Sequence, residues 1–297
     1  MKRLAIIAST ASLLAAPVAL AADDVEMKSF DMGNGIWMIV GQGGNLGVSI
    51  GEDGIFLIDD QYAPLTPAIR AEIAELAGEE RAVDFLVNTH VHGDHTGGNE
   101  NFGKGGTLIV AHENVRKRMT TDAFRESFMK NGGKSLEDAL PTVTFNDRIS
   151  FHLNGETLRT RHYPNAHTDG DSVIFFDGAN VVHTGDLFFN IGYPFVDRGR
   201  GGSVMGLLDA LEDLLGRVDA DTRIIPGHGE ASDREGLVAY RNMIRTVAQR
   251  VEEQVDKGKS LEEIQAMKLT SDFDERWNWQ FINGEKFIAT IHAELTQ

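Results

Sequence analysis

The chain has 297 residues, no cysteine, and 45 acidic against 28 basic side chains, which give a formal net charge of −17. This charge argues against a protein that binds nucleic acid by neutralising phosphates, and against an anionic membrane surface as a partner. The absence of cysteine excludes disulfide scaffolds, thiolate metal sites and cysteine nucleophiles. Any bound metal must therefore be held by histidine, aspartate or glutamate.

The first residues have the pattern of a secretory signal peptide. A basic pair at residues 2–3 precedes an apolar run over residues 4–20, and the run ends in an A-x-A pattern at 19–21. This pattern predicts a signal peptide over residues 1–21, cleaved after Ala21, and hence a periplasmic or secreted protein with no stable membrane association. An uncleaved membrane anchor is the alternative, but Pro17 and the marginal length of the run favour cleavage.

The rest of the chain, residues 25–297, is predicted to form one domain in which strands and helices alternate. The first half has apolar, β-rich runs and two amphipathic segments. We expect strands at 36–40, 46–50, 55–59, 85–89 and 108–110, and helices at 67–77 and 113–129.

The second half of the chain repeats this rhythm. We expect strands at 143–145, 149–153, 157–163, 172–176, 180–183 and 223–225, and helices at 204–215, 235–257, 261–267 and 284–295. Because each half combines strands with helices, the fold class is predicted to be α/β. Two sheets would pack face to face, and helices would cover their outer sides.

The most informative segment is T-H-V-H-G-D-H at residues 89–95, directly after a predicted buried strand. It holds four potential metal ligands: His90, His92, Asp94 and His95. On an extended segment His90 and His92 point to the same side and can chelate one ion, and a turn can direct the other two to a second ion. Imidazole and carboxylate suit zinc, with manganese and iron as alternatives.

Three more candidate ligands lie beside predicted strands. His167 lies in a polar turn before the strand at 172–176, Asp186 ends the strand that carries H-T-G-D, and His228 lies in P-G-H-G after the strand at 223–225. Binding residues are expected at such strand exits, because a sheet is a rigid scaffold.

Together, the H-x-H-x-D-H run, the downstream histidine, the T-G-D strand end and the P-G-H-G turn resemble the metallo-β-lactamase superfamily. The resemblance spans nearly the whole predicted mature chain, and every metal-ligand position is filled. It implies an αββα four-layer sandwich of two mixed sheets and a zinc-dependent hydrolase. It also implies two zinc ions per chain, one held by His90, His92 and His167, the other by Asp94, His95 and His228, with Asp186 bridging them.

By this resemblance, the two ions would lower the pKa of a shared water until hydroxide forms near neutral pH. Asp94 would then act as the catalytic residue that orients this nucleophile. His92 stands where the redox di-iron branch of the superfamily has a carboxylate, which disfavours oxygen chemistry.

The substrate class stays open between alternatives. Asp186 stands where the best-known zinc β-lactamases have cysteine or serine, and aspartate there is typical of glyoxalase II-like thioesterases, lactonases and RNA-processing relatives. The predicted export and the negative charge argue against intracellular thioesters or RNA. We expect a small-molecule substrate, either a β-lactam-type cyclic amide or, alternatively, an exported ester, lactone or thioester. A non-catalytic zinc-binding module is the alternative from another class.

Two residues are candidate substrate contacts. Tyr193 could donate a hydrogen bond to an oxyanion or serve only in packing, and Arg198 could meet a substrate carboxylate or lie in an ordinary surface loop. The glycine-rich segment 41–45 could act as a flap over the site. Three aromatic residues near the C-terminus are interpreted as anchors of the last helix: Trp277, Trp279 and Phe281.

Overall fold

The computed structural model describes residues 25–296. The predicted signal peptide, residues 1–21, lies outside the described residues. Within the described part, every helix is either too short or too polar to cross a membrane.

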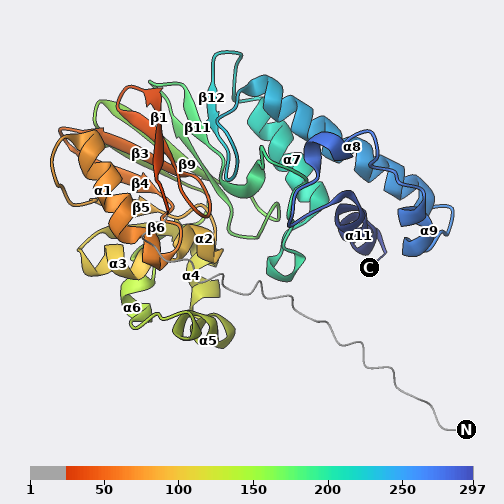
Figure 1. Cartoon of the computed structure of the whole chain (residues 1–297), viewed down its shortest axis with the longest axis horizontal. Coiled ribbons are helices and arrows are strands. Elements are labelled where there is room, and N and C mark those ends of the chain that lie inside the picture. Colours follow the sequence, from red (N-terminus) through yellow and green to blue (C-terminus); the bar gives the residue numbers. More distant parts are fainter. Residues whose placement is uncertain (1–24, 297) are drawn as a thin grey trace, which may run out of the picture.

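Two β-sheets lie at the centre of the molecule (Figure 1). The first sheet has seven strands in chain order: β1 (Lys28–Gly33), β2 (Ile36–Val40), β3 (Leu46–Gly51), β4 (Gly54–Ile58), β5 (Phe85–Val87), β6 (Leu108–His112) and β7 (Val143–Phe145). Strands β1 to β4 pair antiparallel, and β4 to β7 pair parallel. The sheet is therefore mixed.

The second sheet has five strands in the order β12-β11-β10-β9-β8. They are β8 (Arg148–Leu153), β9 (Glu156–His162), β10 (Ser172–Phe176), β11 (Val181–His183) and β12 (Arg223–Ile225). Neighbours from β8 to β11 are antiparallel, whereas β11 and β12 are parallel. This sheet is mixed as well.

Three buried apolar layers hold the sandwich together. Between the sheets, Phe56 and Ile58 pack in one cluster with Ile174 and Phe176. The outer side of the first sheet packs on α1 (Thr66–Ala77) and α3 (Asn99–Lys104). The outer side of the second sheet packs on α7 (Val204–Leu215), α8 (Arg234–Val255) and α11 (Gly284–Leu295). The four layers visible in Figure 1 confirm the predicted αββα sandwich.

Helix boundaries depart from the prediction at residues 113–129. Two helices occupy this stretch, α4 (Glu113–Met119) and α5 (Asp122–Lys130). Thr121 separates them, because its backbone is extended and its side chain accepts a hydrogen bond from the amide of Phe124. A threonine in this conformation is an N-cap, so it begins a new helix.

The elements that the sequence does not reveal are short or exposed. Half of the residues of strand β1 are exposed, and its sequence KSFDMG lacks a regular apolar pattern. Three helices of four residues each are too short to show helical periodicity: α2 (Gly93–Thr96), α6 (Leu136–Ala139) and α10 (Asp274–Trp277). The helix predicted at 261–267 is α9 (Leu261–Ala266).

Loops from the two sheets meet at one edge of the sandwich. The amide of Ser172 donates to the carbonyl of Thr89, and the amide of Asn45 donates to the carbonyl of Gly227. The Asn45 side chain also donates to the carbonyls of Pro226 and Gly229. Segment 41–45 is thus fastened at its end to the P-G-H-G turn, which does not fit a freely moving flap.

Candidate metal centre

The first group of candidate ligands is formed by three histidines. His90 and His92 lie in the loop after β5, and His167 lies in the loop between β9 and β10. The Nδ1 atom of His92 is 3.0 Å from Nε2 of His90 and 2.9 Å from Nε2 of His167. With Asp186 they form a cluster whose ligand atoms all lie within 4.8 Å of one another.

Each of these histidines has a second ring nitrogen that points away from the cluster. The hydrogen bond made by that nitrogen determines the tautomer of the ring. Nδ1 of His167 lies 2.6 Å from the carbonyl oxygen of Phe195, and Nε2 of His92 lies 2.8 Å from a carboxylate oxygen of Asp197. Neither oxygen can donate, so both nitrogens carry protons. Nδ1 of His90 contacts the Thr89 hydroxyl at 3.0 Å.

That hydroxyl also lies 2.7 Å from a carboxylate oxygen of Asp59. Because its proton goes to this carboxylate, the hydroxyl accepts from Nδ1 of His90. All three histidines therefore direct unprotonated nitrogens at one point, where lone pairs would repel each other without a cation between them. These three residues fit a metal ion.

The second group combines Asp94 and His95 on α2 with His228 after β12. Nε2 of His228 is 3.3 Å from Oδ2 of Asp94 and 3.4 Å from Nε2 of His95. Close packing requires a glycine at position 44, where a Cβ would lie 2.1 Å from the His95 ring. This loop therefore helps to fix His95.

Asp186 lies between the two groups, on the 3-10 turn η3 (Gly185–Leu187) that follows β11. Its Oδ2 is 3.6 Å from Nε2 of His90 and 3.4 Å from Nε2 of His167. Its Oδ1 is 3.2 Å from Nε2 of His95 and 3.5 Å from Nε2 of His228. This oxygen is buried and makes no hydrogen bond. One carboxylate oxygen thus faces each group.

The pKa values of His90 and His167 favour neutral imidazole. Burial lowers the pKa of His90 well below its ordinary range, and burial also lowers the pKa of His167 to about 4. Neutral imidazole is the form that binds a metal.

The second group carries a surplus of negative charge. Burial alone would raise the pKa of Asp94, but the charges of His95 and His228 hold it below its ordinary range. Burial alone would lower the pKa of His228, but the nearby charges of Asp186 and Asp94 raise it to about 9. The two carboxylates therefore favour a positive charge at this place, from a proton or from a metal ion.

Comparison with known proteins assigns the chain to a family. The family model of the metallo-beta-lactamase superfamily matches residues 43–228, a range that contains all seven candidate ligands. The chain belongs to this superfamily. Membership supports a hydrolase that binds metal.

Individual relatives in the superfamily are distant. A "metallo-beta-lactamase type 2" of Bacillus cereus is 24% identical over 187 residues, which cover 63% of this chain and 67% of the relative. Among solved structures, a metallo-beta-lactamase from Pontibacter korlensis matches with a TM-score of 0.60 at 18% identity, covering 74% of this chain and 99% of that one.

A second solved structure, a stereoselective inverting sec-alkylsulfatase from Pseudomonas sp., matches with a TM-score of 0.71 at 17% identity. The match covers 91% of this chain but 50% of the sulfatase. At such identities the two structures establish the αββα fold of this superfamily member and nothing more specific.

Two aspartates that support the ligands were missed by sequence reasoning. Asp59 accepts hydrogen bonds from the amide and hydroxyl of Thr89 and from Nδ1 of His95, each at 2.7 Å. Asp197 accepts from Nε2 of His92. Asp59 follows the apolar strand β4, so the strand-exit signal that selected Asp186 also applies to it. Asp197 lies in an irregular loop and offers no such signal.

The candidate substrate contacts need a correction at Tyr193. Its side chain is fully buried, stacks on Phe287, and donates from its hydroxyl to Asp274 at 2.9 Å. It therefore serves in packing, because neither its ring nor its hydroxyl is free. Arg198 is partly exposed at the start of η4 (Arg198–Arg200), beside Asp197. Because it is partly exposed there, Arg198 stays a candidate substrate contact.

Aromatic side chains form a wall beside the two ligand groups. The ring of Phe195 lies 5.7 Å from that of His92, and the ring of Phe281 lies 5.0 Å from that of Phe195. Trp279 lies 6.4 Å from His228. Phe281 is 43% exposed, so it is not the buried anchor that the sequence suggested, whereas Trp277 is buried as predicted.

Proposed function

We propose that this protein is a dinuclear zinc hydrolase that cleaves a carbonyl compound, and that Asp186 bridges the two ions. The observation that carries the proposal is the position of Asp186, which turns one buried oxygen to each ligand group. When bound, two such ions would lower the pKa of water and polarise the substrate carbonyl.

Within this proposal, the ligands differ in their access to a substrate. The side chain of Asp94 is 22% exposed, whereas the side chains of His95 and Asp186 are 0% and 4% exposed. Asp94 is thus the carboxylate that an incoming water can reach. We assign it the catalytic role of orienting that water and accepting its proton. Arg198 is proposed to meet a negatively charged group of the substrate.

For the substrate we propose a small molecule with a β-lactam-type cyclic amide. The two relatives named metallo-beta-lactamases support this class, and the apolar wall of Phe195, Trp279 and Phe281 suits a substrate with an apolar substituent. An ester, lactone or thioester is the second candidate, favoured by an aspartate at position 186. The predicted signal peptide would place the reaction in the periplasm or outside the cell.

The proposal is tested by metal analysis together with steady-state kcat/KM on a carbapenem, a cephalosporin, a lactone and a glutathione thioester. We expect two zinc ions per chain and turnover of at least one cyclic amide. Turnover confined to the lactone or thioester would favour the second candidate. Two bound ions without turnover on the whole panel would instead indicate a zinc-binding module.

The bridging role has its own test in Asp186→Ala. We expect loss of one ion and a fall in kcat/KM of about 100-fold or more, because both groups lose a shared ligand. Full activity with two ions retained would refute the bridge.

A further inference from the structure

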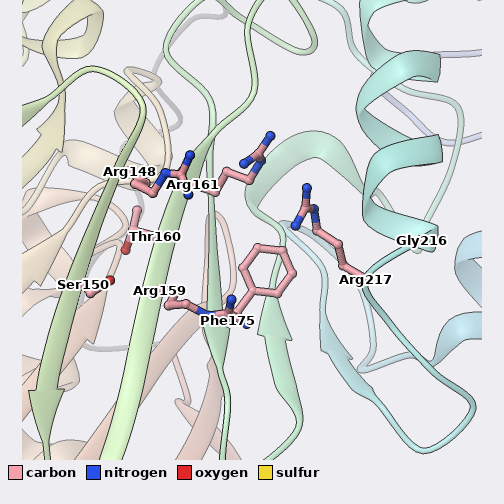
Figure 2. Close-up of a pocket in the computed structure, with 8 residues that line it drawn as sticks. All are labelled: Arg148, Ser150, Arg159, Thr160, Arg161, Phe175, Gly216 and Arg217. Atoms are coloured by element: carbon pink, nitrogen blue, oxygen red, sulfur yellow. The ribbon is translucent and has the colours of Figure 1, made fainter.

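A polar cavity lies on the outer side of the second sheet, where α7 ends (Figure 2). Its volume is about 340 Å³. Residues from β8, β9, β10 and the end of α7 line it: Arg148, Ser150, Arg159, Thr160, Arg161, Phe175, Gly216 and Arg217. Four of the eight are arginines, and the cavity contains none of the seven candidate metal ligands.

The strand register brings the arginines together. Arg148 on β8 lies directly opposite Arg161 on β9, and Arg159 lies opposite Ser150. Side chains two residues apart on a strand point to the same side, so Arg159 and Arg161 share a face. Arg217 joins them from the end of α7, and Figure 2 shows the Phe175 ring between these guanidinium groups.

Neighbouring carboxylates neutralise some of these arginines but not others. Arg217 forms two hydrogen bonds with Asp213, at 2.6 and 2.8 Å. Asp213 also accepts from the hydroxyl of Tyr163 at 2.8 Å. Arg161 comes no closer to it than 3.6 Å, and the Nε of Arg161 is buried without a hydrogen-bond partner. Arg161 is therefore the guanidinium whose hydrogen-bonding capacity is unused.

Arg148 and Arg159 are paired at the rim of the cavity. Arg148 bonds Asp147 at 2.8 Å, and Arg159 bonds Asp177 at 2.9 Å. With Asp213, three carboxylates face four guanidinium groups, which leaves a net positive charge in this cavity although the whole chain carries −17. The positive charge of the cavity is therefore local and does not reflect a basic protein surface.

This arrangement is unfavourable for the fold alone. Like charges directly opposite each other on neighbouring strands destabilise a sheet, and a buried donor without a partner costs free energy. A bound anion would offset the repulsion between the arginines. Guanidinium groups match the oxygens of a tetrahedral dianion, because each can donate two parallel hydrogen bonds.

We propose that this cavity is a binding site for a phosphate group, with Arg161 as its principal donor and with Arg217, which is already paired with Asp213, contributing charge. A second cavity of about 230 Å³ shares Arg159, Phe175 and Arg217 with the first. The remainder of an organic phosphate would lie there, against the ring of Phe175. The site is separate from the metal centre, so the proposal stands independently of the hydrolase function.

The test is calorimetric titration of the metal-loaded full-length protein with inorganic phosphate and with phenyl phosphate at low ionic strength. Phosphate bound at the metal centre is common to all variants, so the difference between variants reports on the cavity. Arg161→Gln should weaken cavity binding about tenfold or more, since one charge-assisted contact is lost. Tighter binding of phenyl phosphate would assign an organic phosphate, and equal binding would assign the free ion.

Arg125→Gln is the matched control. Arg125 is exposed on α5, and this substitution removes the same charge from the surface; phosphate affinity should change less than about twofold. Arg161→Gln should leave the melting temperature unchanged or raise it, because Arg148 loses a like-charged neighbour. Unchanged affinity in Arg161→Gln would overturn the proposal, as would a fall in melting temperature without loss of phosphate binding.

Discussion

The support of His95 by Asp59 can be probed with the isosteric substitution Asp59→Asn. One oxygen of Asp59 accepts from the Thr89 amide, and the other accepts from the Thr89 hydroxyl and from Nδ1 of His95. Both Asp59 and His95 are fully buried. An asparagine must place its NH₂ group at one of these two oxygen positions.

Either orientation of the amide has a defined cost. If the NH₂ group faces the Thr89 amide, two donors meet in a buried place, which costs about 1–3 kcal/mol of unfolding free energy. If it faces His95, the ring proton must move from Nδ1 to Nε2, the nitrogen that lies 3.2 Å from Asp186. A protonated Nε2 cannot bind a metal, so affinity at the second group should fall about 10- to 100-fold.

Two measurements separate these costs. Urea titration reports the loss of unfolding free energy, and chelator competition reports the loss of metal affinity. Asp197→Asn is the matched control, because Asp197 supports His92 in the first group and does not contact His95. It should weaken the first group and leave the second unchanged. If Asp59→Asn bound both ions with wild-type affinity, Asp59 would have no part in fixing His95, and the reasoning would be refuted.

The other predictions concern metal, pH and packing. Removal of metal with a chelator should abolish turnover, and added zinc should restore it; undiminished turnover by metal-free protein would contradict the proposed mechanism. Burial and the neighbouring His112, whose ring stacks at 3.6 Å, lower the pKa of His162 from 6.5 to about 4. Between these pH values the unfolded chain binds more protons, so stability should fall as pH drops from 6.5 to 4. His162→Gln should flatten this dependence when melting temperatures are compared at pH 7 and 5, and an unchanged slope would exclude His162 as its source. Tyr193→Phe should lower the unfolding free energy by about 1–2 kcal/mol, since its buried bond to Asp274 is lost, and leave kcat/KM unchanged. A large fall in kcat/KM would return Tyr193 to the substrate site.

The sequence predicted most strands and the long helices, because their apolar residues repeat with the period of the element. It failed where that signal is weak. Residues 113–129 have one continuous amphipathic pattern, and the break depends on the capping conformation of Thr121. Strand β1 is exposed on an edge, so pairing with β2 rather than composition holds it in place.

For the candidate site, dense spacing made His90, His92, Asp94 and His95 recognisable within one segment. The structure brings His167, Asp186 and His228 to them from three other loops. Sequence reasoning left Tyr193 open between substrate contact and packing, because a position just after a metal-bearing strand does not reveal which way a side chain turns. The arginine cavity was also invisible, since it depends on the register of β8 with β9 and on where α7 ends.

The two ligand groups draw on loops from both sheets, and each sheet carries its own outer apolar layer. An ion held there connects the halves of the chain as a cross-link would, although it can dissociate. Its binding free energy is therefore available only when both halves are in place, which makes the opening of either half more costly. The metal centre would in this way set the cooperativity of unfolding, so that one half cannot open in isolation while the ions are bound.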